Sequence, residues 1–213
     1  MCHKYKGATS AASLGIRSSV GSHLTHSAAY DTLAVLIHIE RRMGMSEQPR
    51  ISYSGGNGKL RHNNRDIVSS NVDPNRVKDN ITFISLPVRV AYDKIFKEAQ
   101  EEYDAKQKRN DRKIHNYFDK LFGDQPHADD LIVQNNNKQK NFYEYVVGIG
   151  DKDTMGYETN PEGAAIAEKI LQEYAEGFQK RNPNFFVFNS VMHRDEATPH
   201  IHFDYIPYTD NCK

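Results

Sequence analysis

Cysteine and long apolar runs are scarce in this chain of 213 residues, and its net charge is zero. The two cysteines, Cys2 and Cys212, stand near opposite ends of a sequence without a secretory signal, which argues against a disulfide framework and predicts a reducing, cytoplasmic setting. The longest apolar run covers only residues 33–37, which is far too short to span a bilayer. The length and polar composition indicate one medium-sized domain with a single core.

Positive charge is concentrated in two places rather than spread along the chain. The 28 basic and 28 acidic residues cancel, which counts mildly against a nucleic-acid partner. Locally, however, Lys59, Arg61 and Arg65 surround His62, and we expect this cluster to contact phosphate. A second basic run at 106–113 is interpreted as the solvated face of a helix, with a phosphate-binding track as the alternative.

The segment 193–202 combines three histidines and two carboxylates between two stretches rich in β-forming residues. This pattern predicts a hairpin with a loop at 194–199. Because side chains alternate along a strand, His200 and His202 share one face, and His193 joins them if it pairs with His200. The side chains expected to face the other way and pack are Phe186, Phe188, Met192, Ile201, Phe203 and Tyr205.

Three neutral imidazoles on one face predict a metal site. Three protein ligands leave coordination positions open for water or a substrate oxygen, which is typical of a catalytic rather than a structural ion. Asp195 and Glu196 are expected to accept hydrogen bonds from the imidazole N–H groups. Surface histidines on an ordinary hairpin are the alternative, and the third histidine at this spacing argues against it.

Two motifs together resemble a known family. The pattern His193-x-Asp195-Glu196-x-x-Pro199-His200-x-His202 follows the third motif of the Mob/Pre (MobV-type) plasmid mobilisation relaxases, which are HUH endonucleases. Arg61 to Arg65 contains their first motif, His-Asn-x-Arg. Residues 71–83 only approximate their second motif. The resemblance extends over about 49–208.

The resemblance implies a reaction and a role for each motif residue. Such enzymes nick one strand of plasmid origin DNA by transesterification, during mobilisation by conjugation, and stay covalently attached to the 5′ phosphate. It implies His62 as the nucleophile and Glu196 as the group that orients it. It also implies Mn²⁺ or Mg²⁺ as the cofactor, held by the three histidines. The residues expected to contact single-stranded or supercoiled origin DNA are Arg61, Asn63, Arg65 and Arg76, with Arg65 on a phosphate.

Several alternatives stay open at this point. Many relaxases use tyrosine as the nucleophile, and Tyr53 lies nearest in sequence to the first motif. A rolling-circle replication initiator shares the covalent chemistry but usually employs tyrosine. In a metal-dependent phosphohydrolase, water attacks and no covalent intermediate forms. A non-catalytic DNA-binding module is the remaining alternative.

The predicted fold is α+β, with a largely antiparallel central sheet and helices packed on its apolar face, as in HUH relaxases. Asn160 and Pro161 mark a helix start, and an apolar stripe continues to Phe178. Residues 1–44 are interpreted as a leader or a poorly packed extension, and 45–213 as the relaxase domain. The resemblance further implies a homodimer formed through a C-terminal region that follows the third motif in family members.

Overall fold

A single antiparallel sheet organises the chain in the computed structural model, which describes residues 49–209. Its five strands lie in the order β1-β3-β5-β4-β2, and every neighbouring pair is antiparallel. The strands are β1 (Ile51–Gly55), β2 (Ile81–Ser85), β3 (Tyr143–Ile149), β4 (Phe185–His193) and β5 (His200–Pro207). Together with the helices they confirm the predicted α+β class. The predicted division at residues 44 and 45 lies outside the described residues.

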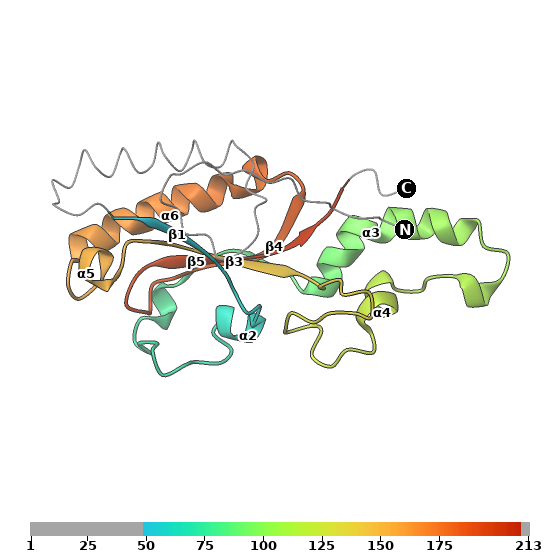
Figure 1. Cartoon of the computed structure of the whole chain (residues 1–213), viewed down its shortest axis with the longest axis horizontal. Coiled ribbons are helices and arrows are strands. Elements are labelled where there is room, and N and C mark those ends of the chain that lie inside the picture. The colour runs from blue at the N-terminus through green and yellow to red at the C-terminus, as the bar shows by residue number, and fades with distance from the viewer. Residues whose placement is uncertain (1–48, 210–213) are drawn as a thin grey trace.

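Helices lie on both sides of this sheet. They are α2 (Leu60–Asn63), α3 (Val88–Ala105), α4 (Tyr117–Phe122), α5 (Lys152–Met155) and α6 (Pro161–Arg181). Figure 1 shows α6 and α2 on opposite sides. The predicted start of α6 is confirmed: Asn160 caps the helix by accepting a hydrogen bond from the Gly163 backbone N–H, and Pro161 occupies the first turn. No helix within 49–209 is long and apolar enough to cross a membrane.

The two faces of the sheet carry different side chains. The face under α6 is apolar, and Leu171, Tyr174 and Phe178 of this helix pack against Ile201 and Phe203 of β5. The opposite face holds a second apolar cluster, formed with α3 and α4, at one end of the strands. At its other end lie the three histidines of the hairpin. The helices thus bury the apolar parts of the sheet and leave the histidine end for α2 and its flanking loops.

Because of a β-bulge in β4, part of the predicted packing is wrong. Val187 pairs with Tyr205 and Asn189 pairs with Asp204, so Phe188 is an extra residue that faces no partner. The extra residue reverses the alternation of side chains beyond it. Phe186 and Phe188 therefore join the α3–α4 cluster on the histidine face, instead of packing with Met192, Ile201, Phe203 and Tyr205 as predicted.

Candidate metal centre

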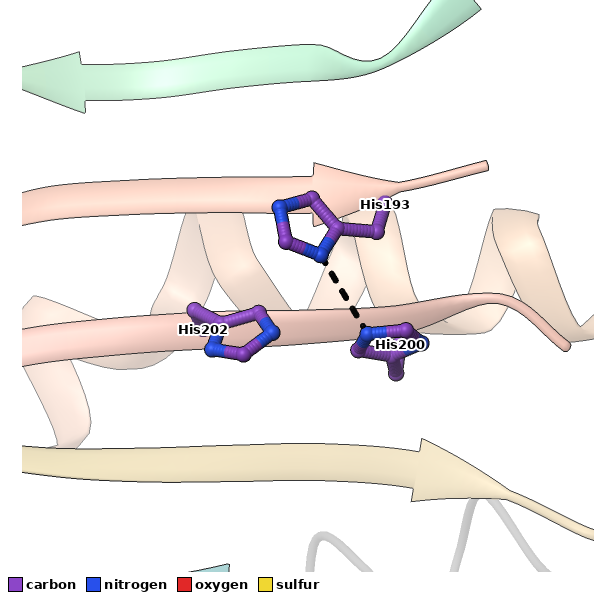
Figure 2. A group of neighbouring side chains, drawn as sticks. All are labelled: His193, His200 and His202. Atoms are coloured by element: carbon purple, nitrogen blue, oxygen red, sulfur yellow. Dashed lines mark hydrogen bonds between the residues drawn. The ribbon is translucent and has the colours of Figure 1, made fainter. Parts of the chain in front are cut away.

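The β4–β5 hairpin brings the three histidines together as predicted. Strand β4 ends at His193, β5 begins at His200, and the loop between them is 194–199. His193 pairs directly with His200, and Val191 pairs with His202. Because His200 and His202 are two residues apart on one strand, all three imidazoles lie on the same face (Figure 2). The predicted register is confirmed.

One nitrogen of each imidazole ring is held by an acceptor. His193 Nε2 lies 2.8 Å from the Asn63 carbonyl oxygen, and His200 Nδ1 lies 3.0 Å from the Thr198 carbonyl oxygen. His202 Nδ1 lies 2.6 Å from Glu144 Oε1. Carbonyl and ionised carboxylate oxygens only accept, so these three nitrogens carry the hydrogens. The other nitrogen of each ring therefore keeps its lone pair.

The three lone-pair nitrogens converge. His193 Nδ1 lies 3.3 Å from His200 Nε2, a contact drawn as the dashed line in Figure 2, and the ligand atoms of the three residues all lie within 4.8 Å of one another. His202 Nε2 is buried without a hydrogen-bond partner among the described residues. Two nitrogens each about 2.1 Å from a shared ion lie roughly 3–4 Å apart. The separation of His193 and His200 thus fits a shared divalent metal ion, and His202 lies beside them as the third candidate ligand.

Burial keeps His193 and His200 neutral. Burial, reinforced by the neighbouring His202, lowers the pKa of His193 to about 2. It also lowers the pKa of His200 below its ordinary value. Metal ligation requires an unprotonated ring nitrogen, so the site is prepared to bind a cation at neutral pH.

Glu144 was not identified from the sequence. Its carboxylate is buried and, besides contacting His202, accepts hydrogen bonds from the Gly58 backbone N–H at 2.6 Å and from Asn63 Nδ2 at 2.7 Å. Burial acts to raise the pKa of Glu144, but the hydrogen bonds, above all that from His202, bring it below its usual value. Glu144 therefore remains an anion that orients His202, one of the three candidate metal ligands. A single acidic residue on the apolar strand β3 was the signal that could have found it.

Asp204 lies deeper on the same face. It accepts hydrogen bonds from Asn63 Nδ2 at 3.1 Å and from Asn189 Nδ2 at 2.9 Å. Burial, followed by the nearby Glu144 charge, raises the pKa of Asp204 to about 7. Asn63 thus connects both carboxylates to the histidines.

His62 stands beside this centre, on α2. Its ring centroid lies 6.1 Å from that of His193 and 6.4 Å from that of His202. Its Nδ1 is 3.1 Å from Ser69 Oγ, and its Nε2 is 3.3 Å from Arg65 Nη1. Since a guanidinium only donates, Nε2 keeps the lone pair and Nδ1–H points to Ser69. Burial and the Arg65 charge lower the pKa of His62, which keeps the ring neutral.

Arg65 fastens the first motif to the hairpin loop. Its side chain is 4% exposed, and it adopts a left-handed backbone with φ of 60°. It donates twice to Asp195, at 2.8 and 2.7 Å, once to Glu196 at 2.7 Å, and from Nη1 to the carbonyl oxygen and Nε2 of His62. These contacts use all five N–H groups of the guanidinium. The guanidinium is thus fully occupied within the protein, and the expected contact of Arg65 with a phosphate stays a prediction.

The sequence profile of the Mob_Pre family, described as plasmid recombination enzyme, matches residues 48–213. The chain belongs to the Mob/Pre family. The resemblance drawn from the motifs is therefore confirmed. No curated protein sequence matches this chain.

Among solved structures, this Mob/Pre chain is similar to crystal structures of a MobM relaxase domain bound to plasmid pMV158 oriT DNA and Mn. The one at pH 5.5 is 17% identical, covers 75% of this chain and 71% of its own, and has a TM-score of 0.40. The one at pH 4.6 is also 17% identical, covers 75% and 72%, and has a TM-score of 0.39.

Glu196 lies near two of the histidines, with its Oε1 3.7 Å from His193 Nδ1 and 3.9 Å from His200 Nε2, but neither Asp195 nor Glu196 accepts a hydrogen bond from an imidazole among the described residues. Asp195 accepts hydrogen bonds from Arg65 and, at 2.6 Å, from Asn80 rather than from an imidazole. Burial acts to raise the pKa of Asp195, but the hydrogen bonds from Arg65 and Asn80 outweigh it and lower this pKa to about 2. Glu196 accepts from Arg65 and, at 2.8 Å, from Asn71. Within 49–209, no hydrogen bond joins Glu196 to His62, and the role of Glu196 in orienting His62 stays a prediction.

The remaining predicted positions are placed unevenly around the centre. Arg61 is exposed beside His62, as a DNA contact requires. Asn63 is only 1% exposed, and its amide binds Glu144 and Asp204, so it supports the centre from within.

The Arg76 guanidinium lies 3.6 Å from the centroid of the Tyr157 ring. Tyr53 packs in the α6 cluster, with its ring 6.3 Å from that of Tyr174. The sheet therefore separates Tyr53 from the histidines.

Proposed function

We propose that this chain is a metal-dependent DNA relaxase that nicks one strand of plasmid origin DNA, with His62 as the nucleophile. The observation that carries the proposal is the position of His62. This neutral histidine has its hydrogen on Nδ1 and its lone pair on Nε2, and it lies beside three imidazoles whose lone pairs converge. Membership of a family of plasmid recombination enzymes supports DNA as the substrate. Tyr53 is disfavoured because it lies on the other face of the sheet.

The proposed step is a transesterification. The His62 Nε2 lone pair forms a bond to the scissile phosphorus, and the bond from phosphorus to the 3′ oxygen breaks. The departing oxygen takes a proton and becomes a free 3′ hydroxyl, while the 5′ phosphate stays on His62 as a phosphoramidate. Attack by a 3′ hydroxyl reverses the step and rejoins the strand.

His193, His200 and His202 would hold the divalent cation. An all-imidazole set suits a transition metal better than Mg²⁺, which favours Mn²⁺ of the two ions implied by the family resemblance. When bound, the ion supplies positive charge to the non-bridging phosphate oxygens.

Ser69 and Arg65 are positioning residues in this proposal. Ser69 Oγ accepts the Nδ1 hydrogen and so selects the tautomer whose Nε2 can attack. Arg65 braces the His62 backbone and occupies Nε2 until the scissile phosphate arrives. Arg61, which is exposed beside His62, is the better candidate for a phosphate contact.

The test uses a pool of random single-stranded DNA oligonucleotides and Mn²⁺, followed by denaturing electrophoresis. We expect the wild type to form a covalent adduct whose 5′ phosphate maps to residue 62 by mass spectrometry. Tyr53→Phe should keep the adduct and His62→Ala should lose it. Cleavage without an adduct would support hydrolysis, and an adduct retained in His62→Ala but lost in Tyr53→Phe would make tyrosine the nucleophile.

A further inference from the structure

A cavity of about 550 Å³ opens beside His62. Its walls come from the loop 56–59, from α2, and from the segments 67–69 and 127–131, with Glu144 and His202 on the sheet side. This volume lies within the range of pockets that hold a small organic ligand. Apart from Lys59, which belongs to the basic cluster around His62, the residues of the loop 56–59 and the segment 127–131 lie outside the predicted motifs.

The cavity walls are attached to the metal centre. The Gly58 backbone N–H, in a left-handed conformation with φ of 59°, donates to Glu144, the same carboxylate that orients His202. The Leu60 backbone N–H donates to the Asp130 carbonyl oxygen at 3.0 Å and so joins the two walls. A shape held in this way exists before any ligand binds.

Three kinds of side chain line the cavity. Lys59 and Arg61 are exposed and make no ion pair with other residues in 49–209. Ile67 is a large apolar side chain that is 49% exposed. The carboxylate of Asp130 is partly buried and accepts no hydrogen bond from any residue between 49 and 209.

We propose that this cavity binds one unstacked nucleotide next to the scissile phosphate, and that Asp130 accepts a hydrogen bond from an amino group of its base. The inference rests on the proposed function, which places a phosphate at His62. Cations suit the phosphates on either side of the nucleotide, and Ile67 suits the flat face of a base. A carboxylate repels phosphate, so Asp130 faces the base edge.

This chemistry predicts which bases are accepted. Cytosine, adenine and guanine present an amino group to a carboxylate. Thymine has no amino group, and its one N–H lies between two carbonyl oxygens that repel a carboxylate. The cavity therefore discriminates against thymine.

The experiment measures binding of fluorescent oligo(dC) and oligo(dT) of equal length by anisotropy, at neutral pH and with EDTA. We expect the wild type to bind oligo(dC) about tenfold more tightly than oligo(dT). Asp130→Ala should lose this preference, and Asp130→Asn, which adds a donor, should narrow it. Asp124→Ala, an exposed acidic residue outside the cavity, should keep it. Lys59→Ala should weaken both complexes equally and reduce their salt dependence.

Equal binding of the two oligonucleotides by the wild type would overturn the inference, as would a full preference in a folded Asp130→Ala protein. Circular dichroism confirms folding, and Asp130→Asn tests the same contact if the alanine variant is unstable. Because the assay needs neither a metal nor a nick, its failure is distinct from a failure to form the His62 adduct.

Discussion

The two faces of the sheet use the same strands in different ways. Under α6 the face is apolar along β5, where Ile201, Phe203 and Tyr205 pack against the helix. On the other face the same strand presents His200, His202 and Asp204 before it returns to an apolar residue at Ile206. The change from polar to apolar occurs beside the bulge at Phe188.

The comparison shows what a buried polar face requires. Burying polar groups is tolerated only where each finds a partner. Asn63, Glu144 and Arg65 provide those partners, and His202 Nε2 is a buried nitrogen that they leave without one. The apolar face is held by packing, whereas the polar face is held by hydrogen bonds that also prepare a ligand site.

Removing one of the three histidines should have the largest effect on the polar face. His200→Ala or His202→Ala should reduce Mn²⁺ affinity by at least about 100-fold, because two imidazoles hold a divalent ion far less tightly than three. Isothermal titration calorimetry measures the affinity. His115→Ala, an exposed histidine remote from the hairpin, should bind as the wild type does. Unchanged affinity in either hairpin variant would mean that the histidines do not form the site.

Arg65→Lys tests the hydrogen bonds that hold the polar face. A lysine cannot reproduce the paired bonds to Asp195, so this buried carboxylate loses its main partner. We expect the free energy of unfolding to fall by about 3 kcal/mol in urea titrations. Arg89→Lys is the matched control, because Arg89 also bridges two carboxylates but is 39% exposed, and it should change stability by less than about 1 kcal/mol. Equal effects would show that the Arg65 network is not structural.

Acid should destabilise the metal-free protein through the polar face. The folded-state pKa of His193 is about 2 against 6.5 when unfolded, so the unfolded chain binds more protons below pH 6.5 and stability falls there. His200 and His62 shift in the same direction. Asp204, raised from 3.8 to about 7, opposes them, since its stabilising contribution is lost as pH rises through 7.

Between pH 7 and pH 5 the shifted pKa values of His193 and Asp204 have nearly equal and opposite effects, so the lowered pKa values of His200 and His62 decide the sign. We therefore expect the free energy of unfolding in EDTA to fall from pH 7 to pH 5. Urea titrations at both values measure it, with His115→Ala as the control that keeps the slope. A free energy of unfolding that stays constant or rises toward pH 5 would contradict the claim that these histidines are neutral in the folded protein.

Two glutamates give the finest comparison within the polar face. Glu144→Gln should lower Mn²⁺ affinity by about tenfold, because a neutral amide orients His202 without the carboxylate charge. Glu196→Gln should keep most of the affinity and slow nicking, because Glu196 contacts Arg65 and Asn71. Calorimetry and adduct formation distinguish them, and a larger loss of affinity in Glu196→Gln would reverse these two roles.

Local patterns predicted the part of the site that lies within one hairpin. The loop at 194–199 and the pairing of His193 with His200 follow from strand alternation and spacing, both of which act over a few residues. The helix start at Asn160 was predictable for the same reason. The bulge at Phe188 was not, because an extra residue is defined only by the partner strand.

Contacts between residues far apart in the chain could not be predicted from the sequence. Glu144 reaches His202 across 58 residues, and the roles of Asn63 and Arg65 depend on burial that a motif does not display. The sequence alone did not show which side chains of β1 point toward α6, so the position of Tyr53 on that face came only from the structure. The interpretation of 1–44 as a leader or a poorly packed extension stays a prediction, because those residues lie outside the described range.

The most direct test of the metal centre is anomalous diffraction at the manganese edge from crystals of the protein grown with Mn²⁺. We predict one strong peak at about 2.1–2.2 Å from His193 Nδ1, His200 Nε2 and His202 Nε2, the nitrogens that keep their lone pairs. A peak bound to other atoms, or no peak within reach of these three nitrogens, would contradict the account.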